Sequence, residues 1–123
     1  EYCSFIVQAI ETNAPFVFHG TVPNTGLIEN LPGEGVVEVA CLADRRGVTP
    51  THFGPLPAHC AAVCDWNLRM FDVAATACIE RSRERAVQAL LLDPLTAAVC
   101  SPAEIRRMTE EMFEAQADLL PGF

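Results

Sequence analysis

At 123 residues the chain can bury the core of one domain and is too short to divide comfortably into two. Half of its residues are hydrophobic, which excludes a disordered or fibrous chain. Asp and Glu outnumber Lys and Arg by 16 to 8, and a surface of this charge repels nucleic acid and anionic lipid. We therefore expect neither a nucleic-acid nor a membrane partner.

Because the sequence shows neither a membrane span nor a secretory signal, we expect a cytoplasmic protein. The best apolar stretch, residues 87–100, is interrupted by Asp93 and Pro94 and falls short of the roughly 18 residues that a membrane span needs. Glu1 leads directly into an amphipathic pattern, so we expect no secretory signal. Because the first residue is not Met, we expect the natural start to lie elsewhere.

The six cysteines could form three disulfides in about 15 pairings. Disulfide scaffolds, however, carry more cysteine and fewer apolar residues than this chain. Most of the six also lie where helical periodicity favours a small hydrophobic side chain. We predict reduced and buried thiols at Cys3, Cys41, Cys60, Cys64, Cys78 and Cys100.

The N-terminal half combines a helix with a strand-rich section. Apolar residues at helical spacing predict a helix over residues 1–12, which Pro15 ends. β-Branched and aromatic side chains then predict strands over 16–22, 36–42 and 48–51, with turns at 23–26, 31–35 and 44–47. Glu38 alternates with two valines and is predicted to face away from them.

The C-terminal half is predicted to be helical. One long helix, with Pro57 in its first turn, is indicated by residues that recur every three or four positions, namely Cys60, Cys64, Asn67, Phe71, Ala74 and Cys78. Shorter helices are predicted over 83–92, from Asp93 onwards, and from the capping box at Ser101 to about Leu119. Since strands and helices are segregated, the sequence predicts an α+β fold over residues 1–123. The strands need the helices or another domain to cover both their faces.

Three kinds of candidate chemistry stand beside plainer alternatives. His59, Cys60 and Cys64 could hold a metal ion, or His59 could activate the Cys60 thiolate, but core cysteines explain the same pattern. Asn67 lies on the apolar stripe, where a buried amide either bonds a backbone or lines a pocket. Paired carboxylates for acid–base work could come from Glu29, Glu34, Glu38 and Asp44, although exposed carboxylates without a catalytic role are the favoured interpretation. Gly33-Glu34-Gly35 lacks the third glycine and the helix of a dinucleotide fingerprint.

Longer motifs are more specific. Pro23-Asn24-Thr25-Gly26 followed by Asn30-Leu31-Pro32 resembles a loop pattern of glycoside hydrolase family 4. Residues 37–44 (VEVACLAD), followed by Gly47-Val48-Thr49-Pro50, resemble the strand pair that comes next in that family. The run ALLLDPLTAAV at 89–99 resembles its helical tail. The resemblance covers nearly the whole chain and is greatest to the branch of α-galactosidases, with α-glucosidases and α-glucuronidases near it.

The resemblance implies an NAD- and Mn²⁺-dependent glycosidase. Such enzymes join an N-terminal Rossmann domain that binds NAD to a C-terminal α+β domain like that of lactate and malate dehydrogenases. Transient oxidation at sugar C3 acidifies the C2 proton, the glycosidic bond is eliminated, and a divalent metal acts as Lewis acid. Family members therefore depart from the two-carboxylate scheme of most glycosidases.

The same resemblance places the NAD site, the metal ligands and the catalytic tyrosine upstream of the matched region. No catalytic, cofactor-binding or metal-ligating residue carries over, and Tyr2 does not correspond to the catalytic tyrosine. Asn24 and Asn30 could border the sugar cleft or an interdomain seam, and loop-capping asparagines are an equal alternative.

We therefore expect a C-terminal domain that is inactive alone and that forms a homodimer or higher oligomer. In an intact enzyme it would contact the Rossmann domain and a glycoside substrate. One alternative is a stand-alone binding or assembly module with the same fold. A second is a helical metal or redox site at His59, Cys60 and Cys64.

Overall fold

The computed structural model describes residues 2–123 and divides into two compact units, with the boundary in the sequence between Ala62 and Val63. The elements in chain order are α1 (Tyr2–Thr12), β1 (Phe16–Pro23), β2 (Val36–Asp44), β3 (Gly47–Pro50), α2 (Ala58–Glu80), α3 (Arg83–Leu92), α4 (Pro94–Val99) and α5 (Pro102–Ala115). The predicted α+β fold, with strands and helices segregated along the chain, is confirmed. Along the described chain no helix is long and apolar enough for a bilayer.

Unit 1 is built on an antiparallel sheet in the order β1-β2-β3. The register sets Phe18 opposite Cys41 and Leu42 opposite Thr49. In the central strand β2, Val37 and Val39 are buried while Glu38 is exposed, so the predicted alternation holds.

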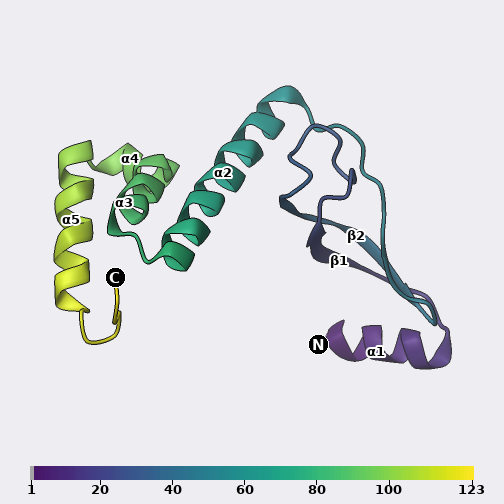
Figure 1. Ribbon diagram of the computed structural model, residues 1–123. Coiled ribbons are helices and arrows are strands. Elements are labelled where there is room, and N and C mark those ends of the chain that lie inside the picture. Colours follow the sequence, from purple (N-terminus) through teal and green to yellow (C-terminus); the bar gives the residue numbers. More distant parts are fainter. Residues whose placement is uncertain (1) are drawn as a thin grey trace. The chain divides into compact units, whose positions relative to one another are not determined.

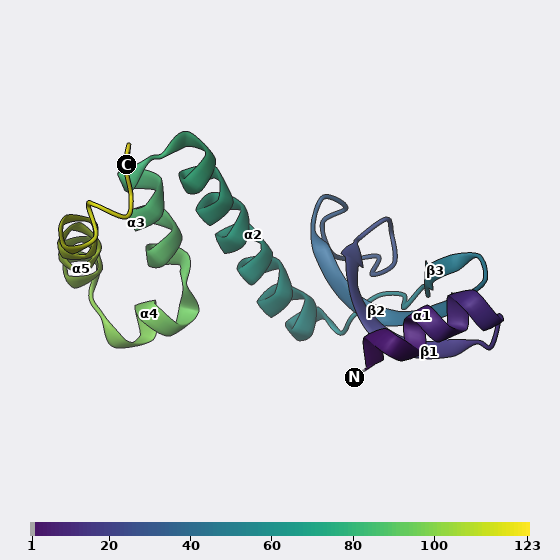
Figure 2. The same cartoon turned by 90° about the horizontal axis from the view of Figure 1, so that it is seen from below.

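Helix α1 covers one face of this sheet, beside β1 and β2 (Figures 1 and 2). Its aromatic side chains meet those of β1, with ring centroids 5.4 Å apart for Phe5 and Phe16 and 6.2 Å for Tyr2 and Phe18. The residues of β1 that alternate with Phe16 and Phe18 point away from α1, and Val17 is one of these residues and is exposed. Within unit 1 the sheet therefore keeps one face largely uncovered.

The connection from β1 to β2, residues 24–35, is organised by the side chain of Asn24. This side chain is 0% exposed. Its amide nitrogen donates to the main-chain carbonyls of Ile28, Leu31 and Pro32 at 3.0–3.1 Å, and its oxygen accepts from the Ile28 N–H at 2.9 Å. One side chain thus takes the place of several main-chain partners in a connection without regular structure.

Unit 2 contains most of α2 and all of α3, α4 and α5, with α3 packed mainly against α5. Ile105 of α5 is 1% exposed, and Val87 and Ala89 of α3 are also buried. Arg106 and Glu84 tie the two helices by a bidentate ion pair, with N–O distances of 2.8 and 3.0 Å.

The predicted helix starts of this unit are confirmed. Ser101 accepts from the Glu104 N–H while the Glu104 carboxylate accepts from the Ser101 N–H, which completes the capping box. The Asp93 carboxylate accepts from the N–H groups of Leu95 and Thr96 at the start of α4. The last helix ends earlier than predicted, at Ala115, because the following residues form tighter turns up to Leu120.

The burial predicted for the apolar face of the long helix is wrong. The predicted apolar face of α2 was expected in a core, yet Phe71 is 59% exposed and Cys64 and Cys78 are exposed. The physical reason is that α2 makes few contacts with the other described elements. Helical spacing predicts that a face is apolar, but not which part of a protein covers it.

Replacing Asn24 by alanine should destabilise unit 1 by about 3 kcal/mol, because three carbonyls and one N–H lose their buried partner. The measurement is urea denaturation followed by circular dichroism. The neighbouring exposed Thr25→Ala is the matched control and should change the free energy of unfolding by less than about 0.5 kcal/mol. Equal stability of the two variants would contradict the role of Asn24.

Acid should weaken unit 2. The Arg106 guanidinium lowers the pKa of Glu84, and the Ser101 hydroxyl lowers the pKa of Glu104, both from the ordinary value of 4.5. The unfolded chain then binds more protons than the folded one, so stability is present above pH 4.5 and is lost as the pH falls through the lowered pKa values.

Thermal denaturation measures this effect at about pH 7, 4.5 and 3, which covers the range in which carboxylates titrate. Glu84→Gln should lower stability at pH 7 and flatten its dependence on pH. The control is Glu114→Gln, because Glu114 makes no ion pair with any residue in the described part of the chain. The assignment fails if both variants keep the pH dependence of the parent chain.

Candidate functional site

Hydrogen bonds join two loops of unit 1, residues 24–35 and residues 51–57. We call them the paired loops. The Asn30 side chain bonds the backbone of Leu56 in both directions, donating to its carbonyl and accepting from its N–H at 2.9 Å each. The N–H groups of Phe53 and Gly54 donate to the Leu27 carbonyl at 2.8 and 3.1 Å. These ties fix exposed backbone that neither sheet nor helix supports.

The paired loops carry an exposed polar pair beside an exposed aromatic ring. Nε2 of His52 lies 3.1 Å from Oε1 of Glu29, and both side chains are more than half exposed. Phe53, next to His52, also faces solvent. A carboxylate and an imidazole can accept and donate hydrogen bonds to a hydroxyl-bearing ligand, and the ring offers an apolar contact.

The three candidate asparagines form different kinds of hydrogen bond. Asn24 and Asn30 organise the paired loops, Asn24 from the interior and Asn30 at the surface. Asn67 belongs to α2 in unit 2, where its amide donates back to the Val63 carbonyl of its own helix at 2.8 Å. Its amide therefore has a partner without reaching a strand or a loop.

The cysteine and histidine pattern of α2 does not converge on a metal ion. His59 and Cys64 are exposed and Cys60 is half-buried. Among residues 2–123 no three His, Cys, Asp or Glu side chains lie close enough to hold a metal. The donor set of the helical metal site is thus too small in this part of the protein.

The prediction that the cysteines are buried is wrong for most of them. All six thiols are free, yet only Cys41 of β2 is buried. Cys60 and Cys100 are half-buried, and Cys3, Cys64 and Cys78 are exposed. Cys3, Cys60, Cys64 and Cys78 lie on helices whose apolar faces remain partly open in this chain, and Cys100 directly follows α4.

The acidic residues that the sequence suggested for acid–base work lie in different environments. Asp44 caps the turn between β2 and β3, accepting from the Arg46 N–H at 2.8 Å and pairing with its guanidinium at 2.9 Å. This Arg46 pairing lowers the pKa of Asp44. Glu38 faces solvent from the middle of β2. Glu29 pairs with His52, a pairing that needs the loop register and has no signal in the sequence.

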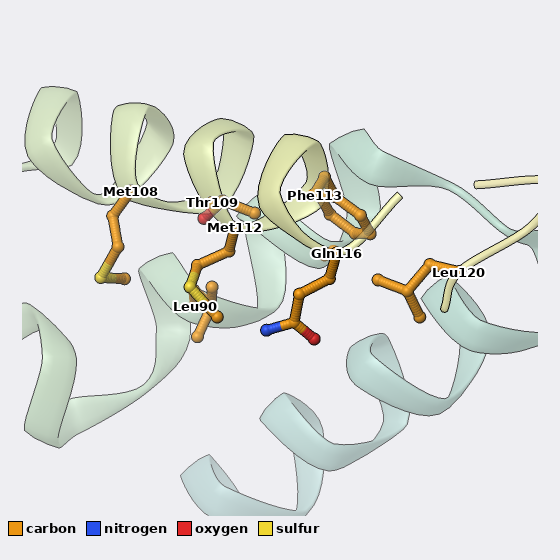
Figure 3. Close-up of a pocket in the computed structure, with 8 residues that line it drawn as sticks. Leu90, Met108, Thr109, Met112, Phe113, Gln116 and Leu120 are labelled. Atoms are coloured by element: carbon orange, nitrogen blue, oxygen red, sulfur yellow. The ribbon is translucent and has the colours of Figure 1, made fainter. Parts of the chain in front are cut away.

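Unit 2 contains a second feature that sequence reasoning missed, an apolar groove. It consists of two adjoining cavities of about 430 and 560 Å³ that share the residues Ala86, Leu90, Phe113 and Leu120. In Figure 3, Met108, Met112 and Gln116 project from one side of α5 toward Leu90 of α3. The four-residue spacing of the two methionines is the sequence signal that could have indicated it.

Similar proteins are known for the whole chain. It is 45% identical over its full length to an α-galactosidase of Bacillus subtilis and 35% identical to an α-galactosidase of Rhizobium meliloti. A maltose-6'-phosphate glucosidase of Clostridium acetobutylicum is 27% identical over 98% of the chain. The chain spans 25–28% of the length of these three relatives.

Solved structures share the fold. Two 6-phospho-α-glucosidases from gut microorganisms, one in complex with NAD and glucose-6-phosphate and one with NAD and Mn²⁺, superimpose with a TM-score of 0.83. They are 24% and 22% identical and are matched over 98% and 94% of this chain, which corresponds to 26% of each of theirs. Residues 1–96 also match the model of the family 4 glycosyl hydrolase C-terminal domain. The chain therefore belongs to family 4 of the glycosyl hydrolases, as the early resemblance in its loops and strands indicated.

Proposed function

We propose that this chain forms the substrate-cleft and oligomerisation part of an NAD- and Mn²⁺-dependent α-glycosidase that acts on α-galactosides. The observation that supports this specificity is the 45% identity to an α-galactosidase along the entire chain. The second α-galactosidase, at 35%, supports the same substrate class. The maltose-6'-phosphate glucosidase is less similar, at 27%.

The cofactors are expected to be held outside this chain. The described residues lack a triad of metal donors, and the sequence has no glycine-rich phosphate loop. In the intact enzyme, NAD would supply the oxidation at C3 and Mn²⁺ the Lewis acid that the family chemistry requires. The chain alone should therefore be inactive, and its own residues would bind, orient and enclose the substrate.

The paired loops are the part of unit 1 best suited to border a sugar cleft. The bonds of Asn24 and Asn30 hold Glu29 and His52 in fixed positions at the surface. Fixed hydrogen-bonding groups cost less ordering entropy when a polar ligand binds. Glu29 and His52 would contact hydroxyl groups of the glycoside, with Phe53 against an apolar face of the ring.

The exposed apolar surfaces support contacts with further protein. Along α2, Trp66 is 54% and Ile79 is 82% exposed. Val63 and Phe71 of the same helix are also exposed, and one sheet face of unit 1 carries exposed Val17. Apolar exposure of this extent is typical of protein interfaces. The nucleotide-binding part of the enzyme and a second copy of the chain are the proposed occupants.

A chimera tests the proposed function. In the Bacillus subtilis α-galactosidase, the matched 28% is replaced by this chain, and hydrolysis of p-nitrophenyl α-galactoside is followed. The expected result is activity that requires NAD and Mn²⁺, while the 123-residue chain alone gives none. The matched glucoside is the substrate control.

The function is contradicted if the chimera is folded and binds NAD but does not hydrolyse the galactoside. The substrate class alone is contradicted if the chimera prefers the glucoside or a 6-phosphorylated sugar. Within an active chimera, Glu29→Gln should raise KM more than it lowers kcat, because a cleft residue that only binds affects ground and transition states alike. Glu34→Gln, a second glutamate of the same loop, serves as the matched control.

A further inference from the structure

We propose that residues 117–123 act as a strap that closes the apolar groove of unit 2, with Arg83 as its latch. The inference concerns unit 2 alone and does not depend on the proposed glycosidase function. It rests on where this segment runs, on what holds it, and on the chemistry of the groove beneath it.

The segment leaves α5 and turns back over the groove. The N–H groups of Leu119 and Leu120 donate to the Gln116 carbonyl at 2.9 and 3.2 Å, which reverses the chain directly after α5. Leu120 then lines both cavities of the groove, and Phe123 lines the larger one. Leu119, between the turn and the groove, is 77% exposed and makes no part of the lining.

Arg83 holds the far end of the strap. Its guanidinium lies 5.1 Å from the centroid of the Phe113 ring and donates from Nη2 to the Phe123 main-chain carbonyl at 3.2 Å. The Phe123 ring stacks on the same Phe113 ring, with centroids 5.1 Å apart. Arg83 at the start of α3 and Phe113 near the end of α5 thus form a single clamp for Phe123.

The strap is suited to open and close. An exposed cation–π contact and one hydrogen bond to an exposed arginine are each weak interactions, and the segment has no regular secondary structure beyond its turns. Gly122 has a φ of +91°, so the last bend depends on a residue that tolerates this region. A few weak contacts therefore separate the closed strap from an open groove.

The lining of the groove explains why closing it matters. Met70, Met108, Met112, Leu90 and Phe113 contribute apolar side chains, and methionines adapt to irregular partners. The closed strap adds Leu120 and Phe123 to this lining. When the strap opens, the groove becomes accessible to an apolar ligand, and when it is closed the access is reduced.

Amide hydrogen exchange of the 123-residue chain, measured by mass spectrometry, tests the latch. Arg83→Gln and Phe123→Ala should each accelerate exchange in residues 117–123 by about fivefold, the factor expected for loss of one weak tertiary contact. The double variant should exchange no faster than either single variant, because both changes break the same clamp.

The matched controls lie beside the tested residues. Arg85→Gln removes an arginine that pairs with Glu80 instead of the strap, and Leu119→Ala shortens an exposed side chain of the strap itself. Both should leave the exchange of residues 117–123 unchanged. Equal acceleration in the controls, no acceleration in the two test variants, or additive effects in the double variant would each overturn the latch.

Binding of the apolar fluorophore 8-anilinonaphthalene-1-sulfonate reports on the groove. Arg83→Gln should increase its bound fluorescence severalfold relative to Arg85→Gln, with unchanged far-ultraviolet circular dichroism. Unchanged fluorescence in Arg83→Gln would show that the strap does not govern access to the groove, even if its exchange accelerates, and would overturn the proposal.

Discussion

The long connection between β1 and β2 would leave several main-chain carbonyls without donors if the side chain of Asn24 were absent. A buried polar group without a partner costs about 1–3 kcal/mol, so such a connection cannot stay folded against the sheet on apolar contacts alone. The amide of Asn24 removes this cost at three carbonyls and one N–H. Everything that the paired loops display at the surface depends on this interior bonding.

Asn30 extends the same principle outward. Its side chain bonds the backbone of Leu56 as another strand would, and so joins two segments that are separated by β2 and β3. Glu29 and His52, one on each segment, come within 3.1 Å as a consequence. A surface pair that is positioned by neighbouring backbone bonds needs little further ordering when it meets a ligand.

Local signals in the sequence predicted most of the fold. The reciprocal bonds of Ser101 and Glu104 lie within four residues, and the alternation of Val37, Glu38 and Val39 reports directly on the two faces of a strand. Signals of this kind need no knowledge of distant residues. The burial of α2 is different, because the apolar side chain of Phe71 looks the same in sequence whether or not another element covers it.

The same contrast between local and long-range signals applies to the residues of the candidate site. Asn24 and Asn30 could be found because they belong to loop motifs that resemble a known family. The pairing of His52 with Glu29, and the clamp of Arg83 on Phe123, require registers between segments that no local pattern encodes. Sequence reasoning therefore found the residues that organise the loops and named Glu29 as a candidate, but missed His52 and the pairing of the two side chains.

The two units reach stability by different means. Unit 1 fixes its exposed loops with many short hydrogen bonds and holds a largely preformed surface. Unit 2 combines well-capped helices with an apolar groove and the weakly held residues 117–123. Hydrogen-bonded loops favour directional contacts with polar groups, whereas a groove lined by methionine and leucine accepts varied apolar shapes. A polar ligand is therefore best matched to unit 1, and adaptable apolar contacts are best matched to unit 2.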